Sequence, residues 1–179
     1  FRFRGDSAVG FSILLSQMLP GTLFIIPLYT TFFRLRLLDS LGGLIVAYTS
    51  FSIPLCTWMM KAYFDTIPSE LEEAALIDGC SPISALFRVI LPLSTPGLVA
   101  TGIYSMILAW NEFTFARTFI NSPDNWPITV GLSSFTSEYT VDWNVLMATA
   151  VICSIPILVV YLVFQKQFVQ GLTSGSVKG

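Results

Sequence analysis

The chain has no histidine, and only 11% of its residues are charged. Histidine is the commonest metal ligand and general base, so its absence argues against a metalloenzyme or a histidine-based proton relay. With 9 lysine and arginine residues and a net charge of −2, the chain has no basic patch with which to bind nucleic acid. Its three cysteines, Cys56, Cys80 and Cys153, form no CxxC pair and are interpreted as small packing residues.

Hydrophobic residues, in contrast, are abundant. They make up 54% of the chain, and the mean hydropathy is +0.73. A helix needs about 20 apolar residues to cross the hydrocarbon core of a bilayer. Four runs without charge are long enough, which predicts an all-α polytopic membrane protein with a transmembrane domain over residues 8–165. The expected spans are residues 8–33, 41–60, 93–117 and 143–164.

Several spans contain prolines, namely Pro20 and Pro27 in the first, Pro54 in the second and Pro156 in the last. A proline inside a helix removes a backbone hydrogen bond and bends the helix, so we expect a kinked helix bundle. The far end of the third span is open, because Glu112 can lie at the membrane interface or in a turn inside the membrane. The later apolar patch, residues 128–132, is too short to cross and suits an interfacial or re-entrant piece.

Four spans place three polar segments on one side of the membrane: residues 1–7, 61–92 and 166–179. Cytoplasmic loops carry an excess of lysine and arginine. The first side has Arg2, Arg4, Lys61, Arg88, Lys166 and Lys178, and the second has Arg34, Arg36 and Arg117. The three polar segments, including the C-terminus, are therefore predicted to be cytoplasmic, although the pair Arg34 and Arg36 weakly opposes this orientation.

The segment 61–92 is a polar stretch between the second and third spans, and its first part predicts a short helix. Its acidic residues are Asp65, Glu70, Glu72, Glu73 and Asp78. Ser69 and Glu72 have the spacing of a capping box at the start of a helix over 70–77. Gly79, which tolerates the left-handed conformation, predicts the end of that helix.

A second short helix is predicted directly after this turn. Ser81 is a good N-cap, Pro82 fits the first helical position, and the helix is expected to continue over 83–91 until Pro92 breaks it. Each helix has an apolar side; these sides consist of Leu71, Ala74 and Ala75, and of Ile83, Leu86, Phe87 and Ile90. A rigid helix–turn–helix indicates a docking element for another subunit. Packing of both helices beneath the spans is the alternative interpretation.

The same stretch carries a pattern of residues at fixed spacing: Glu73, Ala74, Ala75, Asp78, Gly79, Val89, Leu91 and Pro92. This pattern resembles the EAA loop of the membrane-spanning subunits of binding-protein-dependent ABC importers. The sequence has Val89 where the family usually has isoleucine, and Cys80 where alanine is common. The segment 110–113 (WNEF) and the glycine-rich ending from Gly171 are similar to the carbohydrate-importer branch, in particular to maltose-type permeases.

The resemblance implies a fold of the type I ABC importer permease kind. Those permeases have six spans, so the chain is expected to be a fragment with the last four, and residues 1–7 to be a truncated cytoplasmic loop. In that family the EAA loop forms a coupling helix in a cleft of a separate ATPase. The residues expected to couple are Glu73, Ala74, Ala75, Asp78, Gly79, Phe87, Leu91 and Pro92, with Glu73 as the ionic contact and Phe87 and Leu86 as apolar anchors.

The resemblance also implies partners. They are a second permease subunit in a heterodimer, two ATP-binding subunits, an extracytoplasmic sugar-binding protein and membrane lipid, in a bacterial inner membrane. The chain has no GxxxxGK[ST] phosphate loop. We therefore expect no cofactor and no enzymatic activity in this chain, with ATP and Mg²⁺ bound by the partner ATPase. The same family behaviour suggests that the tail reaches between the ATPases; a disordered polar end is the alternative.

A sugar path needs aromatic and hydrogen-bonding side chains that face a water-filled cavity. Residues of this kind within or at the ends of the spans are Gln17, Tyr48, Tyr104, Trp110, Asn111 and Glu112. Glu112 is the strongest candidate, because a carboxylate at membrane depth is costly unless it faces protein or water. For each residue, packing against a neighbouring helix is the alternative. A secondary transporter or channel is the competing function, but the charge-free runs, which end at Asn111 in the third span, contain no ionisable group for a coupling ion.

Overall fold

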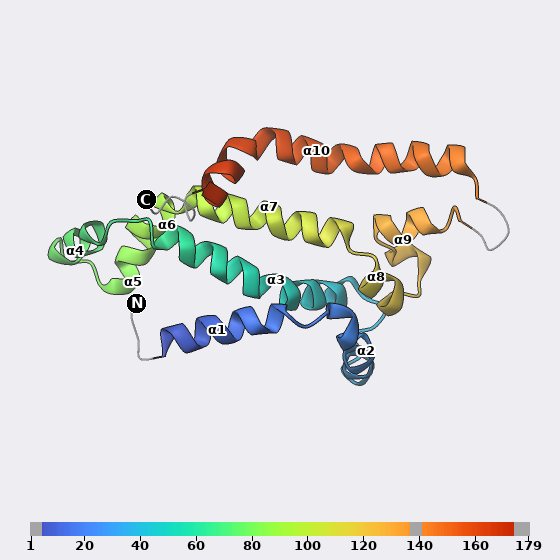
Figure 1. Ribbon diagram of the computed structural model, residues 1–179, viewed down its shortest axis with the longest axis horizontal. Coiled ribbons are helices and arrows are strands. Elements are labelled where there is room, and N and C mark those ends of the chain that lie inside the picture. Colours follow the sequence, from blue (N-terminus) through green and yellow to red (C-terminus); the bar gives the residue numbers. More distant parts are fainter. Residues whose placement is uncertain (1–4, 137–140, 174–179) are drawn as a thin grey trace. The chain divides into compact units, whose positions relative to one another are not determined.

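The computed structural model describes residues 5–136 and 141–173, and within them it consists of helices, turns and one isolated β-bridge between Thr136 and Val141 (Figure 1). The expected all-α class is confirmed. The chain divides into two compact units, and each is described by itself. Unit 1 comprises Phe1–Leu55 with Met106–Val160, and unit 2 comprises Cys56–Ser105 with Tyr161–Gly179.

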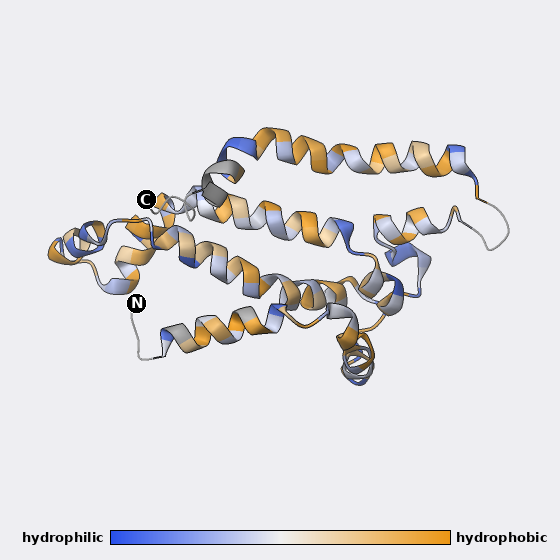
Figure 2. Ribbon diagram, in the orientation of Figure 1, coloured by the Kyte–Doolittle hydropathy of each residue, from blue (hydrophilic) through white to orange (hydrophobic). Residues whose placement is uncertain are grey.

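Two helices in the described residues are long and apolar enough to cross a membrane, α3 (Leu41–Phe64) and α10 (Trp143–Thr173). Two bent pairs of helices raise the number of candidate spans to four if each pair is one span, by length and composition. Figure 2 shows mostly apolar colouring along α10 and a mixture of polar and apolar colouring in the segment between α3 and the next long helix. As predicted, α3 contains Pro54 and α10 contains Pro156.

The first predicted span is not one helix. It is divided into α1 (Asp6–Gln17), η1 (Gly21–Phe24) and α2 (Ile25–Arg34). Pro20 lies in the break, with an extended backbone, so it separates two helices instead of bending one. Pro27 is the third residue of α2, where a missing N–H has no helical partner to lose. The prediction that Pro27 kinks the helix from within is therefore wrong.

The third predicted span is also interrupted, and the fourth is longer than expected. α7 (Thr95–Asn111) ends before Glu112, and α8 (Thr114–Phe119) begins after it, so residues 93–117 are not continuous. α10 continues to Thr173, past the predicted end at residue 164, so the first part of the predicted polar tail is helical. Residues 174–179 of that tail, and residues 1–4, lie outside the described residues.

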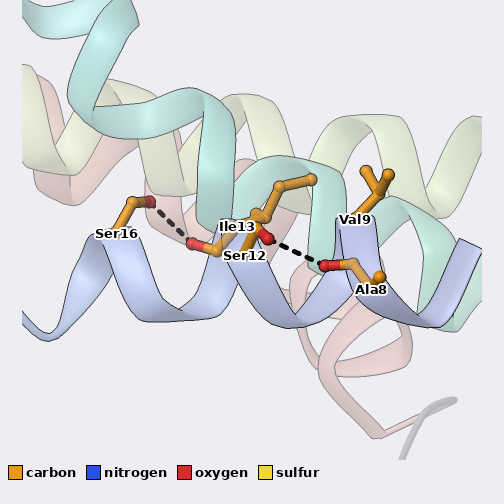
Figure 3. Close-up of a pocket in the computed structure, with 5 residues that line it drawn as sticks. All are labelled: Ala8, Val9, Ser12, Ile13 and Ser16. Carbon is orange, nitrogen blue, oxygen red and sulfur yellow. Dashed lines mark hydrogen bonds between the residues drawn. The ribbon is translucent and has the colours of Figure 1, made fainter. Parts of the chain in front are cut away.

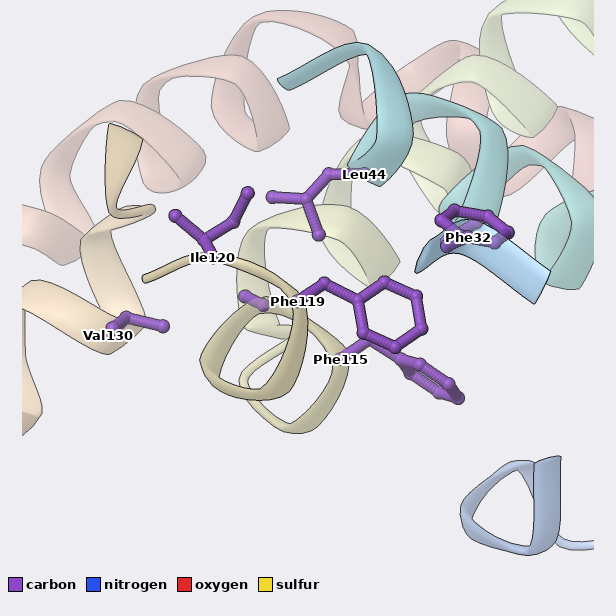
Figure 4. Close-up of a cluster of buried hydrophobic side chains, with 8 residues drawn as sticks. Phe32, Leu44, Phe115, Phe119, Ile120 and Val130 are labelled. Atoms are coloured by element: carbon purple, nitrogen blue, oxygen red, sulfur yellow. The ribbon is translucent and has the colours of Figure 1, made fainter. Parts of the chain in front are cut away.

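Unit 1 contains a cluster of buried side chains contributed by α2, α3, α8 and α9 (Ile128–Ser133), shown in Figure 4. Its aromatic rings pack in pairs: the Phe32 and Phe119 centroids lie 5.1 Å apart, and those of Phe115 and Phe119 lie 5.6 Å apart. The short patch at residues 128–132 forms α9, which contributes Val130 to this cluster. The cluster comprises Phe32, Leu44, Ala47, Phe115, Ala116, Phe119, Ile120 and Val130.

Unit 2 packs through small and weakly polar residues instead. A β-carbon on Gly97 of α7 would lie 2.6 Å from Cγ of Tyr63 in α3, so the two helices approach closely at this point. Further along the same pair of helices, the Cys56 sulfur lies 3.1 Å from the Ser105 hydroxyl. Small residues and hydroxyl groups are the usual contacts between membrane helices, because lipid tails leave no hydrophobic driving force between them.

Gly43 provides a test of the packing at the start of α3. A β-carbon there would lie 1.9 Å from the backbone oxygen of Leu37, whereas a β-carbon on the neighbouring Gly42 meets nothing within 4 Å. We expect Gly43→Ala to destabilise the protein by about 1–3 kcal/mol through overpacking. Gly42→Ala, the matched control, should be neutral or stabilising by about 0.5–1 kcal/mol. Thermal unfolding of the detergent-purified protein measures both, and equal behaviour of the two variants would contradict the packing described.

Candidate functional site

The polar stretch in unit 2 begins with α4 (Ser69–Ile77), and its C-terminal turn forms as the sequence predicts. Gly79 has a φ of 88°, the left-handed region. The N–H of Gly79 donates to the Leu76 carbonyl at 3.1 Å, and the N–H of Cys80 donates to the Ala75 carbonyl at 3.0 Å. This pair of bonds is a Schellman motif, which satisfies the last carbonyls of the helix. The turn is therefore held by backbone bonds that need glycine at position 79.

The predicted capping box at the other end of α4 is wrong. The helix begins at Ser69 itself, Pro68 is the capping residue, and no side chain accepts a hydrogen bond there. Pro68 cannot continue a helix backwards and sets an extended backbone (φ −59°, ψ 133°). Because Ser69 has already entered the helix, its hydroxyl is not placed to accept a bond from Glu72.

The second helix starts as predicted and ends later than predicted. The Ser81 hydroxyl accepts the Ser84 N–H at 3.3 Å, and α5 (Pro82–Ala85) begins with proline. A π-helical turn, η2 (Leu86–Ile90), follows, and then α6 (Leu91–Leu93). The Leu91 N–H pairs with the Leu86 carbonyl, five residues back, so Pro92 falls in the first turn of α6, where its missing N–H is tolerated.

The break expected at Pro92 lies instead at Ser94, where the chain bends by 73° into α7. Ser94 is fully buried, and its hydroxyl donates to the Ile90 carbonyl at 2.6 Å. Leu91 and Pro92 of the predicted coupling set therefore lie inside a helix that leads to this bend.

The helix–turn–helix separates its apolar residues into an inner and an outer set. Ala75 and Ala85 are buried where α4 and α5 pack together, whereas Glu73, Ala74 and Asp78 are exposed. Ala74 and Ala75, which were expected on the same apolar side of the helix, therefore differ in exposure. The exposed side also presents three large apolar side chains, Ile77, Ile83 and Phe87, which are 85%, 67% and 65% exposed.

Ile77 was not among the residues singled out from the sequence. Its signal is its position, since it is a large apolar residue directly before the Asp78-Gly79 turn. Large apolar side chains that stay exposed, together with exposed acidic residues, on a part of the chain that is polar overall, are typical of a protein interaction site. The exposed set Glu73, Ala74, Ile77, Asp78, Ile83 and Phe87 is called the docking face below.

Two of the residues predicted for a substrate path come together in unit 1. The Tyr48 hydroxyl donates to Oε2 of Glu112 at 2.9 Å. The same carboxylate accepts the backbone N–H of Phe115 at 2.8 Å and of Ala116 at 3.0 Å, at the start of α8. Glu112 thus lies in a turn between two helices, and three donors bond to its carboxylate.

The other predicted path residues in unit 1 bond to backbone carbonyls. The Gln17 amide donates to the Phe51 carbonyl at 3.2 Å, and the Trp110 indole N–H donates to the Cys153 carbonyl at 3.2 Å. The Asn111 amide donates to the Ile107 carbonyl at 2.8 Å. Tyr104 belongs to unit 2. An open depression along α1 is lined by other residues, Ala8, Val9, Ser12, Ile13 and Ser16 (Figure 3). The assignment of the six residues predicted from the sequence, Gln17, Tyr48, Tyr104, Trp110, Asn111 and Glu112, to a substrate path stays a prediction.

Asp39, in the link between α2 and α3, forms a polar cluster that the sequence did not reveal. Its carboxylate accepts the N–H of Asn121 at 3.0 Å, the N–H of Ser122 at 2.8 Å and the Ser122 hydroxyl. Its own N–H donates to the Phe119 carbonyl at 2.8 Å. Asp39 has a φ of 55°, which aspartate tolerates better than most residues. The partners lie at least eighty positions away, so only the folded chain brings them together.

Comparison with known proteins adds an independent line of observation. Residues 1–174 match the model of a family described as binding-protein-dependent transport system inner membrane component. The chain is 38% identical to the sulfoquinovosyl glycerol transport system permease protein of Agrobacterium fabrum, over 93% of this chain and 59% of the relative. It is 39% identical to the maltose/maltodextrin transport system permease protein of Yersinia pestis, over 99% and 60%.

A solved structure is similar as well. It is a bacterial ABC transporter involved in the import of the acidic polysaccharide alginate, with a TM-score of 0.78 and 26% identity, over 93% of this chain and 63% of that chain. The chain thus spans about three fifths of the length of the curated relatives it matches. This similarity confirms the expected fold, a polytopic helical membrane protein of the type I ABC importer permease kind.

The Asp39 cluster predicts a dependence of stability on pH. The Ser122 hydroxyl and then the Ser122 N–H hold the Asp39 pKa below its ordinary value, burial opposes them, and the Asn121 N–H adds to the lowering. Because the folded state favours the carboxylate, its contribution is complete above about pH 4 and is lost as the pH falls below that value. We expect Asp39→Asn to lower the melting temperature at pH 7, with the difference from the wild type shrinking below pH 4. A constant difference at both pH values would contradict this role.

Gly79 tests the turn of the docking face. A β-carbon there meets nothing within 4 Å, so the only cost of a side chain is the left-handed backbone. We expect Gly79→Ala to destabilise the turn by about 1 kcal/mol and Gly79→Asn, which tolerates that conformation, by less. Limited proteolysis at the α4–α5 turn measures the order Gly, Asn, Ala. An Ala variant as resistant as the wild type would rule out the conformational requirement.

Proposed function

Because the chain belongs to the family of inner membrane components of binding-protein-dependent transport systems, we propose that it is a permease subunit of an ATP-driven importer of a sugar or oligosaccharide. Its spans contribute to the translocation path, and its helix–turn–helix couples them to a separate ATPase. The sugar class is supported by the relatives, whose names refer to sulfoquinovosyl glycerol and to maltose and maltodextrin.

The docking face is the observation that carries this proposal. Ile77, Ile83 and Phe87 expose apolar surface that a soluble ATPase can cover. Glu73 and Asp78, exposed beside them, supply charge for a basic partner residue. The Schellman turn at Gly79 and the Ser81 cap hold the two helices in a fixed arrangement before binding, which lowers the entropy lost on docking.

The coupling step follows from the way in which the docking face is attached. On one side α4 follows α3 after four residues, and on the other side α5, η2 and α6 lead into the bend at Ser94 and then into α7. A displacement of the docking face by the ATPase therefore acts on two membrane helices directly. The predicted residues Leu91 and Pro92 lie in this connection, and their role is to transmit movement.

The proposed assembly contains a second permease subunit, two ATP-binding subunits and an extracytoplasmic sugar-binding protein. ATP and Mg²⁺ are bound by the ATP-binding subunits. The docking face and the C-terminus lie on the cytoplasmic side of the inner membrane, which the distribution of lysine and arginine supports. The predicted path residues remain candidates for contacts with the sugar.

Reconstitution of the complex tests the proposal. The full-length permease is expected to copurify with its ATPase and to catalyse vanadate-sensitive uptake from a panel of radiolabelled sugars. ATP hydrolysis should rise when the substrate-loaded binding protein is added. Glu73→Ala and Gly79→Pro should abolish transport. Full transport by assembled complexes carrying these two variants would contradict the coupling role, and uptake that ignores ATP and vanadate would contradict the importer itself.

Phe87 offers a sharper test of the docking face. We expect Phe87→Asp to prevent copurification of the ATPase, because a charge replaces an apolar contact of the kind that dominates interfaces and costs about 2 kcal/mol or more. The melting temperature of the permease should stay unchanged, since the side chain is 65% exposed. Asp65→Asn, which breaks only the exposed ion pair with Lys61, is the control and should leave copurification intact. Normal ATPase binding by Phe87→Asp would exclude this surface.

A further inference from the structure

The helix α8 in unit 1 is only six residues long, and a carboxylate from the surrounding structure holds each of its ends. At the start, Glu112 accepts the N–H groups of Phe115 and Ala116. At the other end, the backbone N–H of Asp39 donates to the carbonyl of Phe119, the last residue of the helix, and the Asp39 carboxylate accepts the N–H groups of Asn121 and Ser122, just beyond the helix. So short a helix depends on such partners, because most of its backbone groups have none within the helix.

Glu112 does more than cap the helix. Oε2 also accepts the Tyr48 hydroxyl of α3 at 2.9 Å, and the Glu112 carbonyl accepts the Thr129 hydroxyl of α9 at 2.6 Å. One residue therefore joins α3, the start of α8 and α9. Hydrogen bonds to a charged group are about twice as strong as those between neutral groups. The carboxylate at this position is more than a local cap.

An aromatic contact between α8 and α3 lies next to this hydrogen-bonded link. Phe51 lies one turn after Tyr48 on α3, and its ring centroid lies 4.8 Å from that of Phe115. Ala116, directly after Phe115, is completely buried in the same cluster. The polar contact, Tyr48 with Glu112, and the aromatic contact, Phe51 with Phe115, are thus three residues apart on α3, and Glu112 lies just before the start of α8.

We propose that Glu112 is a positioning residue of the permease: through Tyr48 it joins the first turn of α8 to α3, so that the two helices move together during transport. The proposal rests on the permease function proposed above. Because α3 leads along the chain into the docking face, a movement of α3 driven by the ATPase is transferred to α8 only while this link holds. This role differs from the substrate contact predicted for Tyr48 and Glu112, in which the side chains would bind the sugar.

Tyr48→Phe tests the link, since it removes one hydroxyl and keeps the ring. In the assembled complex, ATP hydrolysis is measured against the concentration of substrate-loaded binding protein. We expect the maximal stimulation to fall by about fivefold or more, the lower end of typical coupling effects. The basal rate, the amount of assembled complex and the half-maximal concentration should equal those of the wild type. The double variant Tyr48→Phe with Glu112→Ala should be no worse than Glu112→Ala alone, because both remove the same link.

Two further variants complete the experiment. Tyr29→Phe is the matched control: its ring contact with Phe119 is kept, and no hydrogen bond of its hydroxyl is found in the described part of the chain, so stimulation should be normal. Glu112→Gln keeps one carbonyl acceptor and should restore part of the stimulation lost in Glu112→Ala. Unchanged stimulation in Tyr48→Phe, or an equal fall in basal and stimulated rates, overturns the proposal. A shift of the half-maximal concentration alone would assign Tyr48 to substrate contact instead.

A measurement without transport separates this proposal from the permease function. Hydrogen exchange of the Phe115 and Ala116 amides in the purified complex should accelerate by about tenfold or more in Glu112→Ala, because both lose a bond to a charged acceptor. If the wild type shows no stimulated hydrolysis, the proposed function fails whatever this exchange shows. If the wild type is stimulated and the two amides exchange equally fast with and without Glu112, the positioning role alone is wrong.

Discussion

Every interruption of a helix in a chain this apolar leaves backbone N–H and C=O groups that need a partner, because hydrocarbon offers none. The fold of this chain depends on how each break meets that requirement. In the polar stretch outside the spans, the backbone at Gly79 closes on itself in a Schellman motif. At Ser94 a buried hydroxyl and N–H bond to the preceding turn. At Glu112 and Asp39 a carboxylate accepts the free N–H groups. The kinks that shape the fold are thus built from a few polar residues.

The two units bond the backbone groups at their helix breaks in different ways, and each way suits the function proposed for that unit. In unit 2 the helix–turn–helix is held by local backbone bonds, which leaves its apolar and acidic side chains free for a partner protein. In unit 1 the bonds run between residues far apart in sequence, so α2, α3, α8 and α9 are tied around one aromatic cluster. A rigid docking element and a tied cluster are what transmission of movement through helices requires, since packed elements shift as bodies instead of deforming.

Local signals predicted local structure well. Gly79, Ser81 and Pro82 act within one turn of their own position, and the structure has the turn, the cap and the helix start that they predict. Two predicted helix boundaries were wrong because each depends on the neighbouring turn. The first short helix begins at Ser69, one residue earlier than predicted, because Pro68 is its cap. The second does not stop at Pro92, because the π-turn places Pro92 in the first turn of α6. The break at Glu112 was left open because its carboxylate bonds partly to Tyr48, which is 64 positions away.

By itself, the sequence determined that the chain is helical, that it is a membrane protein, and that residues 61–92 hold a polar helix–turn–helix, because hydropathy and capping signals are carried by neighbouring residues. Only the tertiary structure decided which side chains of that element face outward, Ile77 and Ala74 among them, because this depends on which side of α4 packs against α5 and the π-turn. It alone brought Asp39 to Ser122 and Tyr48 to Glu112, since hydrogen bonds between distant residues depend on how helices pack and leave no periodic trace in the sequence.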